Sequence, residues 1–139
     1  MNSIHHAQIL GIGIDLVDIG RIERMIMSYG YRFLYRVFTE KEREYAQRCH
    51  APGTTYGKRF AAKEAFSKAI GSGIGEILAF QDIEIINGAK GQPFISLSLQ
   101  NYEKVSDFLG RHFTTFLSLT DEYPYAQAFV VVSASNYTL

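Results

Sequence analysis

The sequence predicts an α+β domain with a mainly antiparallel sheet packed against a long central helix. Two observations support this prediction: an uninterrupted helical stretch at residues 58–70, and apolar strands near both ends of the chain, at 9–17 and 126–133. The expected order of elements, β-α-α-α-β-β-α-β-β, groups helices and strands instead of alternating them, which is typical of α+β folds. The length of 139 residues and a hydrophobic content of 47% suit one domain, residues 1–139, in which residues 1–8 are expected to be frayed.

Composition and charge exclude several classes of protein. Lysine plus arginine and aspartate plus glutamate both number 14, so the net charge of zero gives no argument for nucleic-acid or membrane binding. No apolar run approaches the roughly 20 residues that a membrane span needs, and the N-terminus lacks the features of a signal peptide. The single cysteine, Cys49, excludes an intramolecular disulfide and fits a reducing compartment. We therefore expect a cytoplasmic protein.

The first strand, at residues 9–17, has two unlike faces. Alternation gives it one bulky apolar face, expected to be core: Leu10, Ile12, Ile14 and Leu16. The other face is stripped of bulk by Gly11 and Gly13 and ends in the carboxylate of Asp15. Glycine within a strand often marks close approach by a ligand or another backbone. Two interpretations are therefore open: the space admits a cation with a phosphate, or it lets the central helix pack closely.

The next segment is predicted to be an amphipathic helix. Asp18 is expected to cap it, Gly30 to end it, and its inner stripe is expected to be Ile19, Ile22, Ile26 and Tyr29. Its other side carries Arg21, Arg24 and Met25, and two more arginines follow, Arg32 and Arg36. This arginine-rich face either docks an acidic helix or is an ordinary solvated surface.

Caps, turns and alternation assign the remaining elements. Thr39 and Glu42 form a capping box that opens a helix ending near Arg48. Residues 87–93 are expected to connect a hairpin. The other expected elements are strands at 80–86, 94–99, 115–120 and 126–133 and a helix at 100–109. The last strand contains an unbroken apolar run, 129–132, and is expected to be covered on both faces.

The central helix, residues 58–70, is expected to start after a Thr54 or Thr55 cap and to end at Gly71. At about 100° per residue, one arc is apolar and mostly small: Ala61, Ala62, Ala65, Phe66, Ala69 and Ile70. The opposite arc is expected to be exposed: Phe60, Lys63, Glu64, Ser67 and Lys68. Taken alone, this arc has a simpler interpretation, a solvated face with an i,i+4 Glu64–Lys68 ion pair.

A glycine-rich loop, Gly-Ser-Gly-Ile-Gly at residues 71–75, follows the central helix. It is not a Walker A loop, because no Gly-Lys-Ser/Thr ends it and it follows a helix instead of preceding one. We expect a helix–strand connector, with a mobile lid as the alternative.

Taken together, two separated motifs are more specific than either alone. Residues 11–17, Gly-Ile-Gly-Ile-Asp-Leu-Val, are followed by residues 59–69, Arg-Phe-Ala-Ala-Lys-Glu-Ala-Phe-Ser-Lys-Ala, and then by the glycine-rich loop and Phe-Gln-Asp-Ile-Glu-Ile at 80–85. In order and spacing the chain resembles the small single-domain class of 4′-phosphopantetheinyl transferases, the holo-acyl-carrier-protein synthases. The resemblance runs from about residue 9 to 132. It implies the 4′-phosphopantetheinyl transferase fold.

The resemblance also implies a reaction and a set of partners. The family transfers 4′-phosphopantetheine from coenzyme A to a serine of apo acyl carrier protein, in fatty acid biosynthesis, and uses Mg²⁺. Its metal-binding carboxylates fall on Asp15 and Glu64. Its members are compact trimers with the coenzyme A site at each subunit interface. The acidic carrier docks on the first helix, which here offers Arg21, Arg24 and Met25.

The residues themselves agree with this chemistry. Mg²⁺ usually takes one or two carboxylates and completes its octahedron with waters and substrate phosphates. Position on the wheel adds Lys68 as a catalytic group that reaches the phosphates. Further coenzyme A contacts are expected from residues of the helix and its loop: Lys63, Ser67, Lys68, Gly71 and Gly73. Phe60 is expected to contact the pantetheine arm or the carrier. A metal-activated water or a carboxylate takes the serine proton, and the choice between them, like that between Mg²⁺ and Mn²⁺, stays open.

One departure from the family pattern affects the expected mechanism. Phe116 stands where many relatives carry a histidine, and His112 lies four residues earlier. A second site, just after Thr120, is Asp121. A non-catalytic module that binds coenzyme A or carrier protein is therefore the alternative. A Mg²⁺-dependent nucleotide diphosphate hydrolase that uses the same carboxylates is a third hypothesis.

Overall fold

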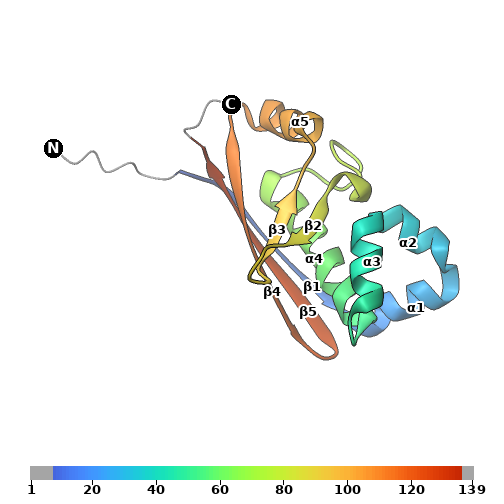
Figure 1. Cartoon of the computed structure of the whole chain (residues 1–139). Helices are drawn as coiled ribbons and strands as arrows, with labels where there is room; N and C mark the ends of the chain where they lie inside the picture. The colour runs from blue at the N-terminus through green and yellow to red at the C-terminus, as the bar shows by residue number, and fades with distance from the viewer. Residues whose placement is uncertain (1–7, 136–139) are drawn as a thin grey trace.

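The computed structural model describes residues 8–135 (Figure 1). In chain order its elements are β1 (Ile9–Asp18), α1 (Ile19–Tyr29), α2 (Tyr31–Val37), α3 (Glu40–Arg48), α4 (Pro52–Ile70), the 3₁₀ turn η1 (Phe80–Asp82), β2 (Glu84–Asn87), β3 (Pro93–Ser96), α5 (Leu99–Leu109), β4 (Phe113–Glu122) and β5 (Tyr125–Ala134). Most of the end expected to fray, residues 1–8, lies outside the described residues, while the carbonyl of Gln8 accepts a hydrogen bond from the Ala134 N–H. No helix within residues 8–135 is long and apolar enough to cross a bilayer.

The strands form two antiparallel sheets. β5 is the central strand of the larger sheet, with order β1-β5-β4, and β2 pairs with β3 in a separate two-stranded ribbon. In Figure 1 the helices and the small ribbon all lie on one side of the larger sheet. The predicted α+β fold, an antiparallel sheet packed against a long central helix, is confirmed.

Helix α4 is the element against which the rest packs, since it contacts both outer and central strands of the larger sheet as well as α1 and α3. It begins at Pro52, earlier than expected. Proline suits the first helical turn, because backbone N–H groups there have no hydrogen-bond acceptor within the helix. Thr55 consequently lies inside the helix, where its hydroxyl donates to the Ala51 carbonyl at 3.4 Å. Gly71 ends the helix in the left-handed conformation, with φ of 83°, as predicted.

The expected core face of β1 is wrong, because the strand is turned the other way. Ile12, Ile14 and Leu16 are 52–62% exposed, whereas the glycine-bearing face lies on α4. The exposed row continues across the sheet, because Ile12 pairs with Val131 and Ile14 pairs with Phe129, which is 42% exposed. We call this surface the outer face: Ile12, Ile14, Leu16, Phe116, Phe129 and Val131. The expectation that β5 is covered on both faces is therefore not met within one chain.

Helix α1 matches its prediction except at its end. The Asp18 carboxylate accepts a hydrogen bond from the Arg21 N–H at 3.3 Å, as expected of a cap. Ile19 and Ile22 are fully buried in the predicted stripe. Tyr29 is 56% exposed, so its assignment to the inner stripe is wrong.

Helix α2 was not expected. It begins directly after Gly30, which both ends α1 and precedes α2. Arginine and tyrosine residues at exposed positions hide its apolar spacing, although Phe33, Leu34 and Val37 are all buried. The predicted capping box of α3 is present: the Thr39 hydroxyl accepts from the Glu42 N–H, and the Glu42 carboxylate accepts from the Thr39 N–H.

The first two strands after α4, β2 and β3, are shorter than expected. Asp82 accepts a hydrogen bond from the Ala79 N–H at 2.9 Å, which stabilises the η1 turn, so β2 begins only at Glu84. β3 ends at Ser96, because the Ser98 hydroxyl caps α5 by accepting from the Asn101 N–H at 3.1 Å. β4 and β5 extend slightly beyond the predicted 115–120 and 126–133.

Candidate active site

The face of β1 that carries the glycines lies directly on α4. A β-carbon on Gly11 would be 1.8 Å from the Ala69 carbonyl oxygen, and one on Gly13 would be 1.9 Å from that of Ala65. Of the two interpretations open from the sequence, the close approach of the helix is therefore confirmed, and no space is left there for a cation. This contact fixes Asp15, two residues beyond Gly13 on the same face, against the helix.

Three charged side chains meet at this junction: Asp15 from β1 and Glu64 and Lys68 from successive turns of α4. The Lys68 ammonium donates to Asp15 Oδ1 at 3.0 Å and to the Ile14 carbonyl oxygen at 2.9 Å. The Asp15 side chain is 16% exposed and that of Lys68 is 54% exposed, so the group lies at the surface. The three predicted catalytic residues are thus brought together.

The surroundings of Glu64 disfavour its charged form. Partial burial raises the pKa of the Glu64 carboxyl above its ordinary value of 4.5, the Asp15 carboxylate raises it further, and the Lys68 ammonium lowers it. Two carboxylates and one ammonium within electrostatic reach form a site with excess negative charge. Added positive charge would relieve the repulsion between the carboxylates.

Two other residues of the predicted polar arc are buried. Lys63 is 0% exposed and Ser67 is 4% exposed, so their placement on an exposed, coenzyme A-binding arc is wrong. The Ser67 hydroxyl donates to the Lys63 carbonyl oxygen at 3.2 Å, one turn back in the same helix. The wheel failed because α4 is covered on several sides, so a polar position on it is not necessarily a solvated one.

Lys63 instead joins several elements of the core. Its ammonium donates to Glu42 Oε1 at 2.7 Å and to the carbonyl oxygens of Val37 at 2.6 Å and Phe80 at 3.0 Å. Glu42 is 1% exposed, and its other oxygen accepts from the Ile85 N–H at 3.1 Å. Burial lowers the pKa of Lys63, and the Glu42 carboxylate opposes that shift. The sequence showed Glu42 only as part of a capping box.

The glycine-rich loop follows directly on the charged group. Gly71 donates its N–H to the carbonyl oxygens of Ser67 and Lys68, so it forms the helix end beside the Lys68 turn. A β-carbon on Gly73 would meet Glu76 Oε1 at 3.3 Å. The loop is a connector between α4 and η1, and coenzyme A binding by Gly71 and Gly73 stays a prediction.

The residues predicted to bind a partner lie on and beside α1. Arg21 and Arg24 are exposed, and Met25 is half-buried against the core. A hollow of about 290 Å³ lies between α1 and α2, lined by Met25, Tyr29, Arg32, Phe33 and Arg36. Phe60 is half-buried and stacks on Phe80, with ring centroids 5.5 Å apart.

A second group of cations was not singled out from the sequence. Lys41, Arg48 and Arg59 line a hollow of about 360 Å³ between α3, α4 and β2. Arg59 is 4% exposed, donates to Asn87 Oδ1 at 2.7 Å and lies over the Tyr45 ring at 4.4 Å. Its Nε is buried without a hydrogen-bond partner among the described residues. The sequence signal that could have identified this group is Arg59, a long cationic side chain within an alanine-rich helix.

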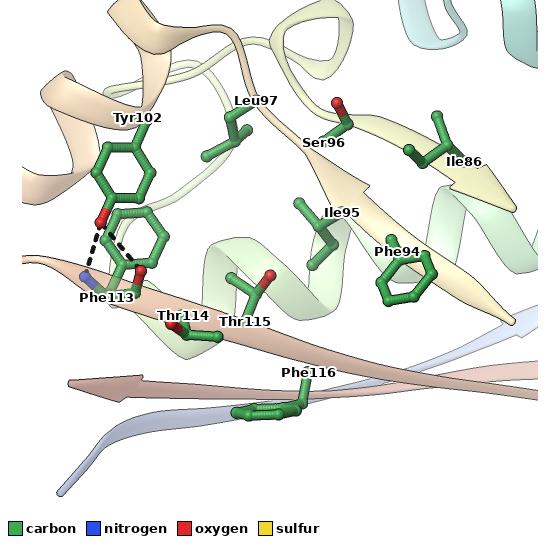
Figure 2. Close-up of a pocket in the computed structure, with 10 residues that line it drawn as sticks. All are labelled: Ile86, Phe94, Ile95, Ser96, Leu97, Tyr102, Phe113, Thr114, Thr115 and Phe116. Carbon is green, nitrogen blue, oxygen red and sulfur yellow. Dashed lines mark hydrogen bonds between the residues drawn. The ribbon is translucent and has the colours of Figure 1, made fainter. Parts of the chain in front are cut away.

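A larger hollow, about 590 Å³, lies elsewhere (Figure 2). It separates β3 from β4 below α5, and its lining is mostly apolar: Ile86, Phe94, Ile95, Ser96, Leu97, Tyr102, Phe113, Thr114, Thr115 and Phe116. The Tyr102 hydroxyl bonds to the backbone N–H and carbonyl of Phe113. Within residues 8–135 no carboxylate or cation lines this hollow, so the charged group around Asp15 is the better candidate for chemistry.

Phe116 lies in β4 on the outer face, 59% exposed, where it pairs with Val131. His112 stacks on Tyr102 with ring centroids 6.1 Å apart, and Asp121 forms an ion pair with Lys58 at 3.0 Å. His112 and Asp121 are therefore engaged with neighbouring side chains, whereas Phe116 is exposed on the outer face.

The fold and the charged group define a class: an α+β protein in which two carboxylates and a lysine lie together at the junction of a strand and a helix. A model of the 4′-phosphopantetheinyl transferase superfamily matches residues 11–128. The chain is 46% identical over 128 residues to a holo-(acyl-carrier-protein) synthase of Methylorubrum populi, a match that covers 91% of this chain and 94% of the relative. It is 42% identical over 128 residues to the synthase of Bartonella tribocorum, covering 91% and 96%.

Solved structures agree with these relatives. The crystal structure of the Neisseria meningitidis synthase has a TM-score of 0.81 and 36% identity, covering 90% of this chain and 98% of that one. The Bacillus anthracis synthase, solved in complex with coenzyme A, has a TM-score of 0.76 and 36% identity, covering 93% and 100%. The chain therefore belongs to the 4′-phosphopantetheinyl transferase superfamily and, within it, to the holo-(acyl-carrier-protein) synthases.

Proposed function

We propose that this protein transfers the 4′-phosphopantetheine group of coenzyme A to a serine of apo acyl carrier protein, releasing adenosine 3′,5′-bisphosphate, in fatty acid biosynthesis. The observation that carries the proposal is the convergence of Asp15, Glu64 and Lys68 at the free edge of β1. The synthases to which the chain is similar support it, as do the Bacillus anthracis and Helicobacter pylori neighbours solved with coenzyme A. A cytoplasmic location remains a prediction.

Asp15 and Glu64 are proposed to hold Mg²⁺. Their donor set fits the ion, which favours one or two carboxylates and leaves its remaining positions to water and substrate phosphates. Within residues 8–135 no cluster of three or more histidine, cysteine, aspartate or glutamate side chains is arranged to hold a metal, so waters and substrate oxygens would complete the shell. The bound ion would neutralise charge on the coenzyme A diphosphate and on the leaving phosphate. Mn²⁺ satisfies the same donors.

The chain's own cations are proposed to bind the phosphates. Lys68 is exposed and one turn from Glu64, so its ammonium can hold the diphosphate beside the carboxylates. Coenzyme A also carries a phosphate on its ribose, and the hollow between α3, α4 and β2 suits such a group because three cations, Lys41, Arg48 and Arg59, line it against one carboxylate, Glu44. The backbone N–H groups around Gly71 and Gly73 remain candidates for further contacts.

The carrier protein is proposed to dock on α1 and α2. Arg21 and Arg24 offer exposed positive charge, and the hollow between the helices is lined by Met25 together with Arg32 and Arg36. An acidic helix with an apolar side chain fits both features, since charge guides the encounter and the hollow accepts the side chain. Phe60, stacked on Phe80, remains a candidate for contact with the carrier or the pantetheine arm.

The outer face is proposed to be the interface of a homotrimer. Five of its side chains, all except the half-buried Val131, are 42–62% exposed on a sheet that bears no helix on that side (Figure 1). A contiguous apolar sheet face of this kind is rarely left in water. Sedimentation equilibrium should give the mass of three chains. A monomeric mass at micromolar concentration would contradict the proposal.

Weighing the carrier tests the reaction directly. The protein is incubated with coenzyme A, Mg²⁺ and apo acyl carrier protein, and the carrier should gain the mass of the phosphopantetheinyl group. No gain with binding retained would favour the non-catalytic module, and release of adenosine 3′,5′-bisphosphate without carrier would favour the hydrolase. Asp15→Ala and Glu64→Ala should abolish the gain with the fold kept, whereas Asp107→Ala, which removes an exposed carboxylate on α5, should not change it. Wild-type rates in both site variants would show that the metal assignment is wrong.

A further inference from the structure

We propose that Lys68 occupies the cation position of the resting site, so that a divalent ion binds tightly only together with a polyphosphate that takes the ammonium away from Asp15. This inference rests on the proposed function, since it concerns the same carboxylates. It assigns to Lys68 a role before the reaction, as a competitor of the metal, in addition to holding phosphate.

The geometry of the Lys68 ammonium carries the argument. It donates to Asp15 Oδ1 at 3.0 Å and to the Ile14 carbonyl oxygen at 2.9 Å, so it has two acceptors on the same edge of β1. Among the described residues, β5 is the one strand that pairs with β1, and it lies on the opposite edge. Oδ1 is one of the oxygens that a metal on Asp15 would use. Lys68 therefore already holds a position that a divalent ion would need.

The charges of the site give the competition its direction. Lys68 follows Glu64 by one turn of α4, and the electrostatic influence of both Lys68 and Asp15 on Glu64 places all three groups in one field. A divalent ion that arrives alone must displace the ammonium from Asp15 and then bind beside it, where the two cations repel each other. Within residues 8–135, Asp15 is the one anionic group that accepts a hydrogen bond from this ammonium.

A diphosphate changes this balance. It offers the ammonium new acceptor oxygens and offers the metal further ligands, so both cations gain partners at the same time. Metal and polyphosphate should then each strengthen the binding of the other, and the coupling should be equal in both directions. Part of this coupling comes from metal–phosphate contact itself. The part due to Lys68 is isolated by measuring the metal alone.

Titration with Mn²⁺, followed by the electron paramagnetic resonance signal of the free ion, measures that affinity without coenzyme A or carrier. Lys68→Met in the full-length protein should bind Mn²⁺ at least about tenfold more tightly than the wild type, because the competing ammonium is gone. Lys68→Arg, which keeps the charge, should bind like the wild type. Lys58→Met is the matched control: Lys58 forms a comparable ion pair with Asp121, also at 3.0 Å, and its loss should not change Mn²⁺ affinity.

With coenzyme A present, the advantage of Lys68→Met should disappear, because the variant also lacks an ammonium for the diphosphate. Unchanged, weaker or unmeasurable Mn²⁺ binding by Lys68→Met would overturn the inference, as would an equal gain in Lys58→Met. Lys68 is half exposed, so far-UV circular dichroism of the variant should match the wild type. Transfer is measured separately by carrier mass, so failure of the Mn²⁺ result and failure of the proposed reaction are distinguishable.

Discussion

Replacing Gly13 by alanine tests the contact that positions the site. The added β-carbon would lie 1.9 Å from the Ala65 carbonyl oxygen and 2.8 Å from the Ala69 nitrogen, where 3.4 Å is an ordinary contact. β1 would therefore have to move off α4 by about 1.5 Å, since neither backbone atom can turn away as a side chain can. Overpacking typically costs about 1–3 kcal/mol, and two collisions with helix backbone place Gly13→Ala at the upper end of that range, ~3 kcal/mol. The same movement displaces Asp15 from Glu64.

Thermal unfolding at one fixed protein concentration measures the stability. A loss of about 3 kcal/mol should lower Tm by about 10 °C for a domain of this size. Transfer, measured by the mass of the carrier, should fall about a hundredfold, because a displacement of about 1 Å in an active site has that effect. Gly20→Ala is the stability control, since its β-carbon would meet only the side-chain ends of Asp18 and Arg24, at 3.1 and 3.3 Å. Wild-type Tm and transfer in Gly13→Ala would refute the reasoning.

Three further changes test the buried pair, the site carboxylate and the outer face. Lys63→Met leaves the Glu42 carboxylate buried without its partner and should lower the free energy of unfolding in urea by about 3–5 kcal/mol. The double variant Lys63→Met/Glu42→Gln should recover part of that loss. An unchanged free energy of unfolding in the single variant would contradict the burial of the pair. Because the folded protein raises the pKa of Glu64, it favours the neutral form, and stability contributed by that form is lost as the pH rises past 4.5. Glu64→Gln should therefore raise Tm at pH 7 relative to the wild type, with little change at pH 4, while transfer falls at least about a hundredfold; a lower Tm at pH 7 would contradict this. Ile14→Asp should reduce the sedimenting mass to that of one chain with circular dichroism unchanged, and an unchanged mass would exclude the outer face as the interface.

Local signals in the sequence predicted most of the fold correctly. The Asp18 cap, the capping box of Thr39 and Glu42, and the Gly71 stop each depend on residues within one helical turn, and the structure contains all three. The pairing of Asp15 with the helix that carries Glu64 was also predictable, because both belong to motifs with a fixed order. Helix α2 was missed because Gly30 marked only the end of one helix, although it also precedes the next.

Tertiary packing decided what the sequence left open. Alternation along β1 separates two faces but does not say which one meets the helix. The glycine face packs on α4 because its lack of side chains allows contact with the helix backbone. Similarly, the helical wheel of α4 grouped Lys63 with Glu64 and Lys68. A wheel cannot show that Glu42, 21 residues earlier, is a buried partner of Lys63. A buried polar partner far away in the sequence leaves no periodic signal.

The Glu42–Lys63 pair has a consequence for how the molecule opens. Its hydrogen bonds connect five elements: the end of α2, α3, η1, β2 and α4. Separation of any one of them would therefore break at least one hydrogen bond to a buried charged group. Partial fraying of the helical half is therefore suppressed, and amide protons around Lys63 should exchange with solvent only when the whole chain unfolds. The helix that carries Glu64 is therefore not expected to unfold locally while the core stays folded.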